Sequence, residues 1–124
     1  MLNLDYRDAR PIYEQVRDNL RRLMVSGAIQ EGEKLPSVRS LASNLAINPN
    51  TIQRAYAELE EEGYLVSQPG KGSFARGPGG GGRRREELLQ QFDQTVSELM
   101  FLGMTPEELA GRLRAARTVG GDPV

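Results

Sequence analysis

Side chains that form directional hydrogen bonds are concentrated in a short segment after Pro49. They are Asn50, Thr51, Gln53 and Arg54. Asparagine and glutamine can pair bidentately with adenine, arginine with guanine, and threonine can bind a base or a phosphate. These residue types therefore suit the reading of base edges in the major groove of duplex DNA. The alternative is an ordinary solvated surface, because any exposed helix face is polar.

A helix over residues 49–62 would position these side chains. At 100° per residue, its apolar positions share one direction. They are Ile52, Ala55, Tyr56 and Leu59. Asn50 and Arg54 point the opposite way, with Thr51 and Gln53 on the flanks. The carboxylates at 58 and 60–62 all lie at the far end, which we expect to tilt away from DNA.

A second short helix is predicted just before this one. Ser37 is suited to cap a helix over 37–46, and Asn48 repeats the signal as a cap followed by Pro49 in the first helical position. Two short helices joined by about three residues indicate a helix-turn-helix. A further amphipathic helix is predicted between Pro11 and Gly27, since apolar residues recur there at helical spacing.

A β-hairpin is predicted directly after the helix-turn-helix. Residues 64–67 and 73–76 have the composition of short strands, and residues 68–72 form a turn rich in glycine and proline. A hairpin in this place is typical of the wing of a winged helix. The first domain is therefore predicted to cover residues 1–76.

Four further residues are candidate DNA contacts with open alternatives. Arg39 is either an ordinary helix-surface arginine, with or without a nearby acid as partner, or a contact to a phosphate or groove. Lys71 stands between Gly70 and Gly72 at the predicted wing tip. Glycines there serve turn geometry, but they also permit close approach of the backbone to a phosphate or the minor groove.

The remaining chain is predicted to form a linker and a helical tail. Residues 77–83 are glycine-rich and are expected to be flexible without packing. Residues 84–118 are predicted to form a helical dimerisation region, in which Thr105 to Glu108 have the pattern of a capping box for the last helix. Residues 119–124 are expected to be disordered. The apolar residues predicted to pair two chains are Leu89, Phe92, Val96, Leu99, Leu109 and Leu113. The adjacent arginines 83–85 could touch DNA or form a solvated face.

Composition excludes several functions. The chain has 124 residues, no cysteine and no histidine, so neither a disulfide nor the commonest metal ligands and general base are available. We therefore expect that the protein is not an enzyme and that it binds neither a metal nor a cofactor. A formal net charge of −1 argues against DNA binding by bulk electrostatics alone. With no signal peptide and no membrane-spanning stretch, a cytoplasmic protein is expected.

A long ordered string of motifs resembles one known family. It includes PIYEQV at 11–16, EGEKLPSVRSLA at 31–42, NPNTIQRAY at 48–56, LEEEG at 59–63 and GKGSF at 70–74. Over about residues 8–76 the chain is similar to GntR-family transcriptional regulators. The short tail is similar to the YtrA-type subfamily, whose two-helix C-terminal region mediates dimerisation.

The resemblance implies a mainly α fold, with a winged helix-turn-helix followed by a short two-helix tail. It implies DNA contacts by Arg39, Asn48, Gln53 and Lys71, together with Asn50, Thr51 and Gly70. Many relatives carry arginine where this chain has Pro49, so their base preferences do not transfer.

We therefore expect a homodimer that binds a palindromic double-stranded operator as a transcriptional regulator, most often a repressor. Whether an unidentified small-molecule effector also binds is left open. The alternative is a winged-helix module for protein–protein contact without DNA binding.

Overall fold

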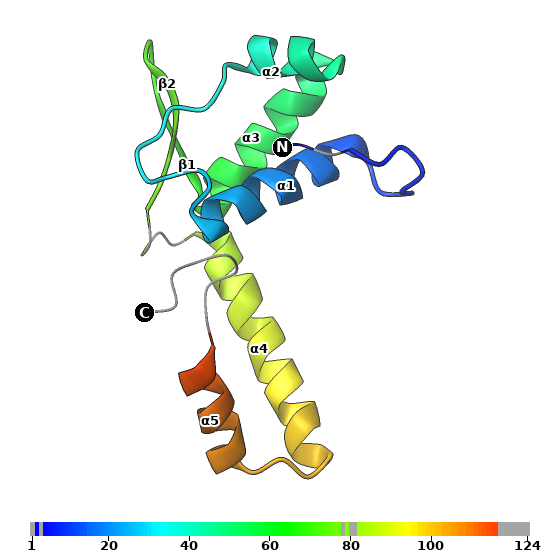
Figure 1. The fold of residues 1–124 in the computed structure, drawn as a ribbon, viewed down its shortest axis with the longest axis vertical. Helices are drawn as coiled ribbons and strands as arrows, with labels where there is room; N and C mark the ends of the chain where they lie inside the picture. The colour runs from blue at the N-terminus through cyan, green and yellow to red at the C-terminus, as the bar shows by residue number, and fades with distance from the viewer. Residues whose placement is uncertain (1, 3, 78, 80–81, 117–124) are drawn as a thin grey trace.

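The computed structural model describes residues 2, 4–77, 79 and 82–116. These residues form five helices and one antiparallel two-stranded sheet. In chain order the elements are α1 (Ile12–Ser26), α2 (Val38–Leu45), α3 (Pro49–Glu62), β1 (Leu65–Gln68), β2 (Gly72–Ala75), α4 (Arg83–Phe101) and α5 (Pro106–Ala115). The predicted mainly helical fold with a small hairpin is confirmed (Figure 1).

The core of the winged helix lies between α1, α2 and α3. Val16 and Leu20 of α1 face Ile52 and Leu59 of α3, and all four side chains are buried in one apolar cluster. The stripe on each helix follows from residues three and four apart sharing a face. Gly27 ends α1 in a left-handed conformation at φ 88°, as the sequence predicted.

The hairpin strands are each shifted by one residue from the prediction. Leu65 pairs with Ala75 and Gln68 with Gly72. Tyr64, which we predicted as the first strand residue, instead donates its backbone N–H to the carbonyl of Leu59 at 2.9 Å. That bond belongs to the end of α3, where the last carbonyl groups need donors.

A third segment runs beside the hairpin, which the sequence did not predict. Lys34 forms an isolated bridge with Phe74. The N–H of Leu35 donates to the carbonyl of Ser73, and the N–H of Ala75 donates to that of Glu33, each at 2.9 Å. The wing is therefore attached to the loop that leads into α2.

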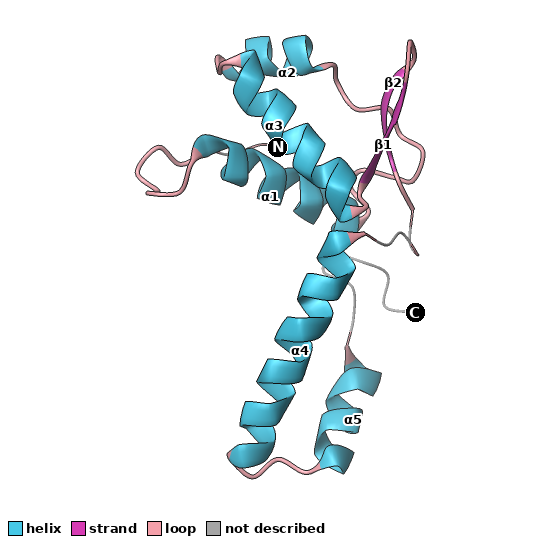
Figure 2. Cartoon of the chain, turned by 180° about the vertical axis from the view of Figure 1, so that it is seen from behind, coloured by secondary structure: helices cyan, strands magenta, loops and turns pink. Residues whose placement is uncertain are grey.

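The two tail helices extend away from the winged helix (Figures 1 and 2). Thr105 and Glu108 form the predicted capping box at the start of α5. Residues 119–124, for which we predicted disorder, lie outside the described residues. Within the part of the chain that the structure describes, no helix is long and apolar enough to span a membrane.

The junction between the winged helix and α4 differs from the prediction in two ways. Arg83, which we assigned to the linker, is the first residue of α4. Gly82, for which we expected no packing, has φ 81° and lies against the end of α3. A Cβ atom at position 82 would come within 2.7 Å of the backbone oxygen of Glu61. Only glycine fits this close approach without displacing the backbone.

Candidate nucleic-acid interface

The helix-turn-helix is held by two side-chain caps. Ser37 Oγ accepts the N–H of Ser40 at 3.1 Å, and Asn48 Oδ1 accepts the N–H of Asn50 at 2.8 Å. Each cap satisfies one of the N–H groups that a helix leaves free at its start. Both caps were predicted from the sequence. Since the Asn48 carbonyl oxygen already accepts the cap bond, its amide NH₂ is the group that can donate to a ligand.

Residue 46 gives the turn between α2 and α3 its direction. Ala46 adopts φ 56° and ψ 47°, and it is the one non-glycine residue with positive φ among those described. Its neighbour Ile47 donates a backbone hydrogen bond to the carbonyl of Ala42 at 2.9 Å. Alanine is strained in this region, so the surrounding contacts of the turn impose the conformation.

Tyr56 ties the buried face of α3 to the loop before α2. Its hydroxyl donates to the carbonyl oxygen of Pro36 at 2.7 Å. Burial raises the pKa of Tyr56 to about 12, because the ionised phenolate would lose its hydration. The phenol is therefore neutral at physiological pH, and the bond fixes α3 relative to the start of α2.

The predicted polar face of α3 is open to solvent. Asn50, Gln53 and Arg54 are exposed, and Thr51 is half-buried on the flank. Among the described residues, neither the Asn50 nor the Gln53 side chain forms a hydrogen bond. Their amide groups are thus free to bind base edges.

Arg54 has a more defined position than the sequence indicated. Its guanidinium carbon lies 3.7 Å from the centroid of the Tyr13 ring on α1. Its Nε lies 3.8 Å from Glu58 Oε2, and the side chain remains 61% exposed. A cation over an aromatic face is attracted by the ring quadrupole. Arg54 is therefore held on the side of α3 that borders α1.

The carboxylates of α3 bind other elements. Glu58 Oε1 pairs with Arg17 Nη1 at 2.6 Å, and Glu62 Oε1 pairs with Arg21 Nη2 at 2.7 Å. Burial alone would lower the pKa of Arg17, but its hydrogen bonds to Glu58 and Asp18 outweigh this and raise it. The sequence did not reveal these pairs, which join α1 to α3 and neutralise acids behind the polar face.

The lysine at the wing tip, Lys71, forms no ion pair with any residue that the structure describes. Gly70, Lys71 and Gly72 are all exposed. A Cβ atom on Gly72 would come within 2.9 Å of Lys34 Cε, and φ at Gly72 is 120°. Gly72 therefore makes room for a second cation beside Lys71. Lys34 was not among the predicted site residues, because its proximity depends on the loop pairing with β2.

The tertiary structure brings the predicted DNA-contacting segments to one end of the molecule. The first turn of α2, which carries Arg39, the start of α3 and the wing tip all lie opposite the tail (Figures 1 and 2). Arg39 is exposed and forms no ion pair with any described residue, so its guanidinium is available to a phosphate. Among the described residues, no cluster of acidic side chains could hold a metal ion.

The sequence of the winged helix matches a known protein family. Residues 12–74 match the family "Bacterial regulatory proteins, gntR family". The HTH-type transcriptional repressor YtrA of Bacillus subtilis (strain 168) is 43% identical over 74 residues. That match covers 60% of this chain and 57% of YtrA, so the matched part spans little more than half of the relative.

Solved structures agree with both the winged helix and the tail. The transcriptional antiterminator from Listeria monocytogenes EGD-e has a TM-score of 0.69 and 32% identity, covering 100% of this chain and 96% of that one. AraR(DBD) in complex with operator ORR3 has a TM-score of 0.52 and 27% identity, covering 59% and 88%. These relatives are regulators and not enzymes. The chain therefore belongs to the gntR family of bacterial regulatory proteins, in its YtrA-type subfamily, and is a DNA-binding transcriptional regulator.

Proposed function

We propose that the protein is a homodimeric repressor that binds a two-fold symmetric operator, with α3 in the major groove. The observation that carries the proposal is the sorting of α3. Its first turns present free amide groups at Asn50 and Gln53, while Glu58 and Glu62 at the other end are paired with arginines. A groove-reading helix requires this polarity, because phosphates repel unpaired carboxylates.

Each predicted contact has a separate role in this proposal. Asn50, Gln53 and Arg54 bind base edges from α3, and Thr51 binds a base or phosphate on its flank. Asn48 contributes its remaining NH₂ group. Arg39 on α2 and Lys71 on the wing neutralise phosphates, which sets the position of the helix without reading sequence. Gly70 and Gly72 allow the wing backbone to approach the duplex.

The tail supports the proposal of a homodimer. Leu89 and Phe92 are 53% and 46% exposed on α4, and Leu113 on α5 is exposed as well. Val96, Leu99 and Leu109 are only half-buried in the single chain. An apolar surface of this kind is typical of an interface. A second copy that covers it would place two α3 helices for adjacent half-sites.

We propose that the protein represses its target genes and acts in the cytoplasm. The repressor YtrA shares the DNA-binding region at 43% identity. A dimer that occupies a promoter blocks polymerase by its position alone. The protein would act in the cytoplasm, where bacterial promoters are accessible.

Selection from random duplex DNA at physiological salt tests the proposal. We expect an enriched palindrome with half-sites separated by about 10 base pairs or a multiple of that spacing. Recovery of single half-sites would contradict the dimer but would still support sequence-specific DNA binding. No enrichment would contradict specific binding and would favour the alternative of a protein-interaction module, which capture of a partner from cell extract would then test.

A further inference from the structure

The two lysines of the chain lie close together on the wing. The sequence has 16 basic residues, and all except Lys34 and Lys71 are arginines. Lys71 is at the tip of the hairpin, whereas Lys34 belongs to the loop that leads into α2. That loop runs beside the hairpin (Figure 1). The lysines are far apart in the sequence, so the pairing of the loop with β2 is what brings them together.

The backbone pairing decides where the Lys34 side chain lies. Lys34 pairs with Phe74 at the edge of β2, so the two side chains share one face of the wing. Gly72 comes two residues before Phe74 on that same face, and a long side chain can reach such a diagonal neighbour. Lys34 Cε lies 2.9 Å, and its Nζ 3.7 Å, from the point that a Cβ atom on Gly72 would occupy. The ammonium group of Lys34 is therefore beside the residue that follows Lys71.

The acidic residues nearest in the chain do not neutralise Lys34. The Glu33 carboxylate accepts the backbone N–H of Gln30 at 3.0 Å. The Glu31 carboxylate lies against Gly77, at the base of the hairpin. Lys34 itself is exposed and forms no ion pair with any residue that the structure describes. Together with the unpaired lysine at the tip, the wing thus presents two ammonium groups without a counter-charge.

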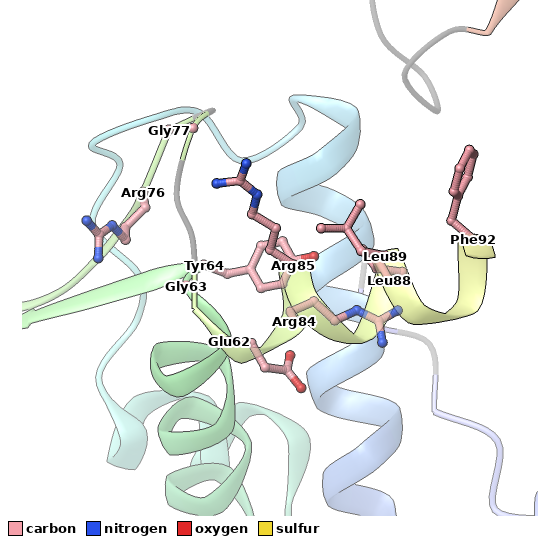
Figure 3. A pocket seen from close by; sticks show the side chains of 11 residues that line it. Glu62, Gly63, Tyr64, Arg76, Gly77, Arg84, Arg85, Leu88, Leu89 and Phe92 are labelled. Atoms are coloured by element: carbon pink, nitrogen blue, oxygen red, sulfur yellow. The ribbon is translucent and has the colours of Figure 1, made fainter. Parts of the chain in front are cut away.

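The other cation of the hairpin, Arg76, is at the opposite end from the lysines. It directly follows β2 and borders the arginine-lined cleft at the start of α4, which also includes Arg84 and Arg85. The Arg76 guanidinium points away from Arg85 and from the apolar side chains of α4 (Figure 3). Because Arg76 is exposed at the base of the same hairpin, it is a matched control for the charge of Lys34.

We propose that Lys34 is a second phosphate contact of the wing, which binds the DNA backbone together with Lys71 while α3 occupies the major groove. The wing tip lies at the same end of the molecule as the start of α3 (Figures 1 and 2). An ammonium group on a flexible stem acts as a point charge, which suits a phosphate because that contact needs no fixed geometry. Lys34 therefore adds affinity for any duplex and no sequence preference. This assignment rests on the proposed function, which places α3 in the groove.

The salt dependence of DNA binding measures this contact. Each neutralised phosphate contributes about 0.9 to the slope of log affinity against log salt concentration, so Lys34→Gln should lower the slope of a dimer by about 1.8. Its loss of affinity should then be about tenfold larger at 50 mM salt than at 200 mM. The selected operator and a scrambled duplex should be affected alike, since a phosphate carries no sequence information. Fluorescence anisotropy at several salt concentrations provides the measurement.

Two further variants separate a local contact from a structural effect and from net charge. Lys34→Arg keeps the charge and should retain the slope of the unchanged protein. Arg76→Gln removes one positive charge at the base of the same hairpin and should leave the slope almost unchanged. An undiminished slope in Lys34→Gln would overturn the proposal. An equal fall in slope in Arg76→Gln would also overturn it, because net charge alone would then explain the effect.

Lysine footprinting locates the contact on the protein, because every other basic side chain is an arginine. Limited acetylation followed by peptide mass spectrometry compares the full chain free and bound to the selected operator. We expect Lys34 and Lys71 both to lose reactivity in the complex, since a phosphate favours the protonated amine and only the neutral amine is acetylated. Protection of Lys71 alone would overturn the assignment of Lys34 and leave the proposed function intact. Failure of the unchanged protein to bind any duplex would contradict both.

Discussion

Arg54 illustrates how a neighbour on another helix decides what a single residue can do. The helical spacing of α3 predicts that Arg54 is exposed, and its side chain is 61% exposed in the structure. The ring of Tyr13, 41 positions earlier in the sequence, determines the direction of its guanidinium. A stacked guanidinium keeps its N–H donors at the edge of the ring, so Arg54 can still bind guanine. Because stacking already restricts the side chain, binding costs less conformational entropy.

A double-mutant cycle measures this positioning. We expect Arg54→Ala to reduce specific operator binding by roughly 1–3 kcal/mol. Tyr13→Leu should reduce it less, and the double variant should show a coupling of about 0.5–1 kcal/mol. Fluorescence anisotropy with the operator provides the measurement. Tyr6→Leu, an exposed tyrosine without this contact, serves as the control and should add to Arg54→Ala without coupling. Additive losses for Tyr13 and Arg54 would refute the positioning role.

The ends of the helices show which elements are specified locally. The caps at Ser37, Asn48 and Thr105 were predicted, because each places a short acceptor before a helical segment. The left-handed Ala46 was not predicted, since alanine carries no preference for that conformation. The turn accepts the strain because α2 and α3 both pack on the same core.

Ala46→Gly should therefore stabilise the fold. Glycine removes a left-handed strain of roughly 1–2 kcal/mol but loses more chain entropy on folding. The net gain expected in the free energy of unfolding is about 0.5–1 kcal/mol. Ala57→Gly, in the exposed middle of α3, has no strain to relieve and should lose about 1 kcal/mol. Urea denaturation compares the two. A loss of stability at both positions would show that Ala46 is not strained.

Glu62 joins three helices at one point. Its carboxylate pairs with Arg21 of α1 and Arg83 of α4 from the end of α3, and it is almost fully buried. Glu62→Gln removes the shorter of the two ion pairs of Arg21 and leaves only its 3.3 Å contact to Asp18, so we expect a loss of about 3 kcal/mol in unfolding free energy. Glu61→Gln is the matched control, because the Glu61 side chain is 66% exposed and lies 3.8 Å from Arg83. Its effect should stay within about 0.5 kcal/mol. Equal effects in thermal or urea unfolding would show that burial of the pair has no consequence.

At the scale of the whole molecule, the chain has two regions that differ in how much of their apolar surface they bury. The winged helix buries its own apolar core, whereas no residue of α4 or α5 is buried. Two isolated helices with an open apolar face have too little core to be stable alone. The predicted face includes Leu89, Phe92 and Leu113, but four further apolar side chains are also exposed on the tail: Leu88, Met100, Phe101 and Leu102.

Phe92→Glu should dissociate the proposed dimer. Phe92 is 46% exposed in the single chain, so the charge leaves the fold of the monomer intact but cannot be buried between two copies. Light scattering should show a monomer, and binding to the palindromic operator should fall to the level of a half-site. Gln94→Glu adds the same charge on the opposite side of α4 and should stay dimeric. A dimeric Phe92→Glu protein would place the interface elsewhere.

Sequence alone determined the helix-turn-helix, the caps, the wing and the polar start of α3, because these features depend on residues close together in the chain. Helical spacing, cap chemistry and turn residues act over a few positions. Tertiary structure alone decided the stacking of Arg54 on Tyr13, the pairing of Glu58 and Glu62 with α1, and Lys34 beside the wing. It also produced the arginine-lined cleft at α4. Such contacts join residues tens of positions apart, and only the packing of one element on another brings them within reach.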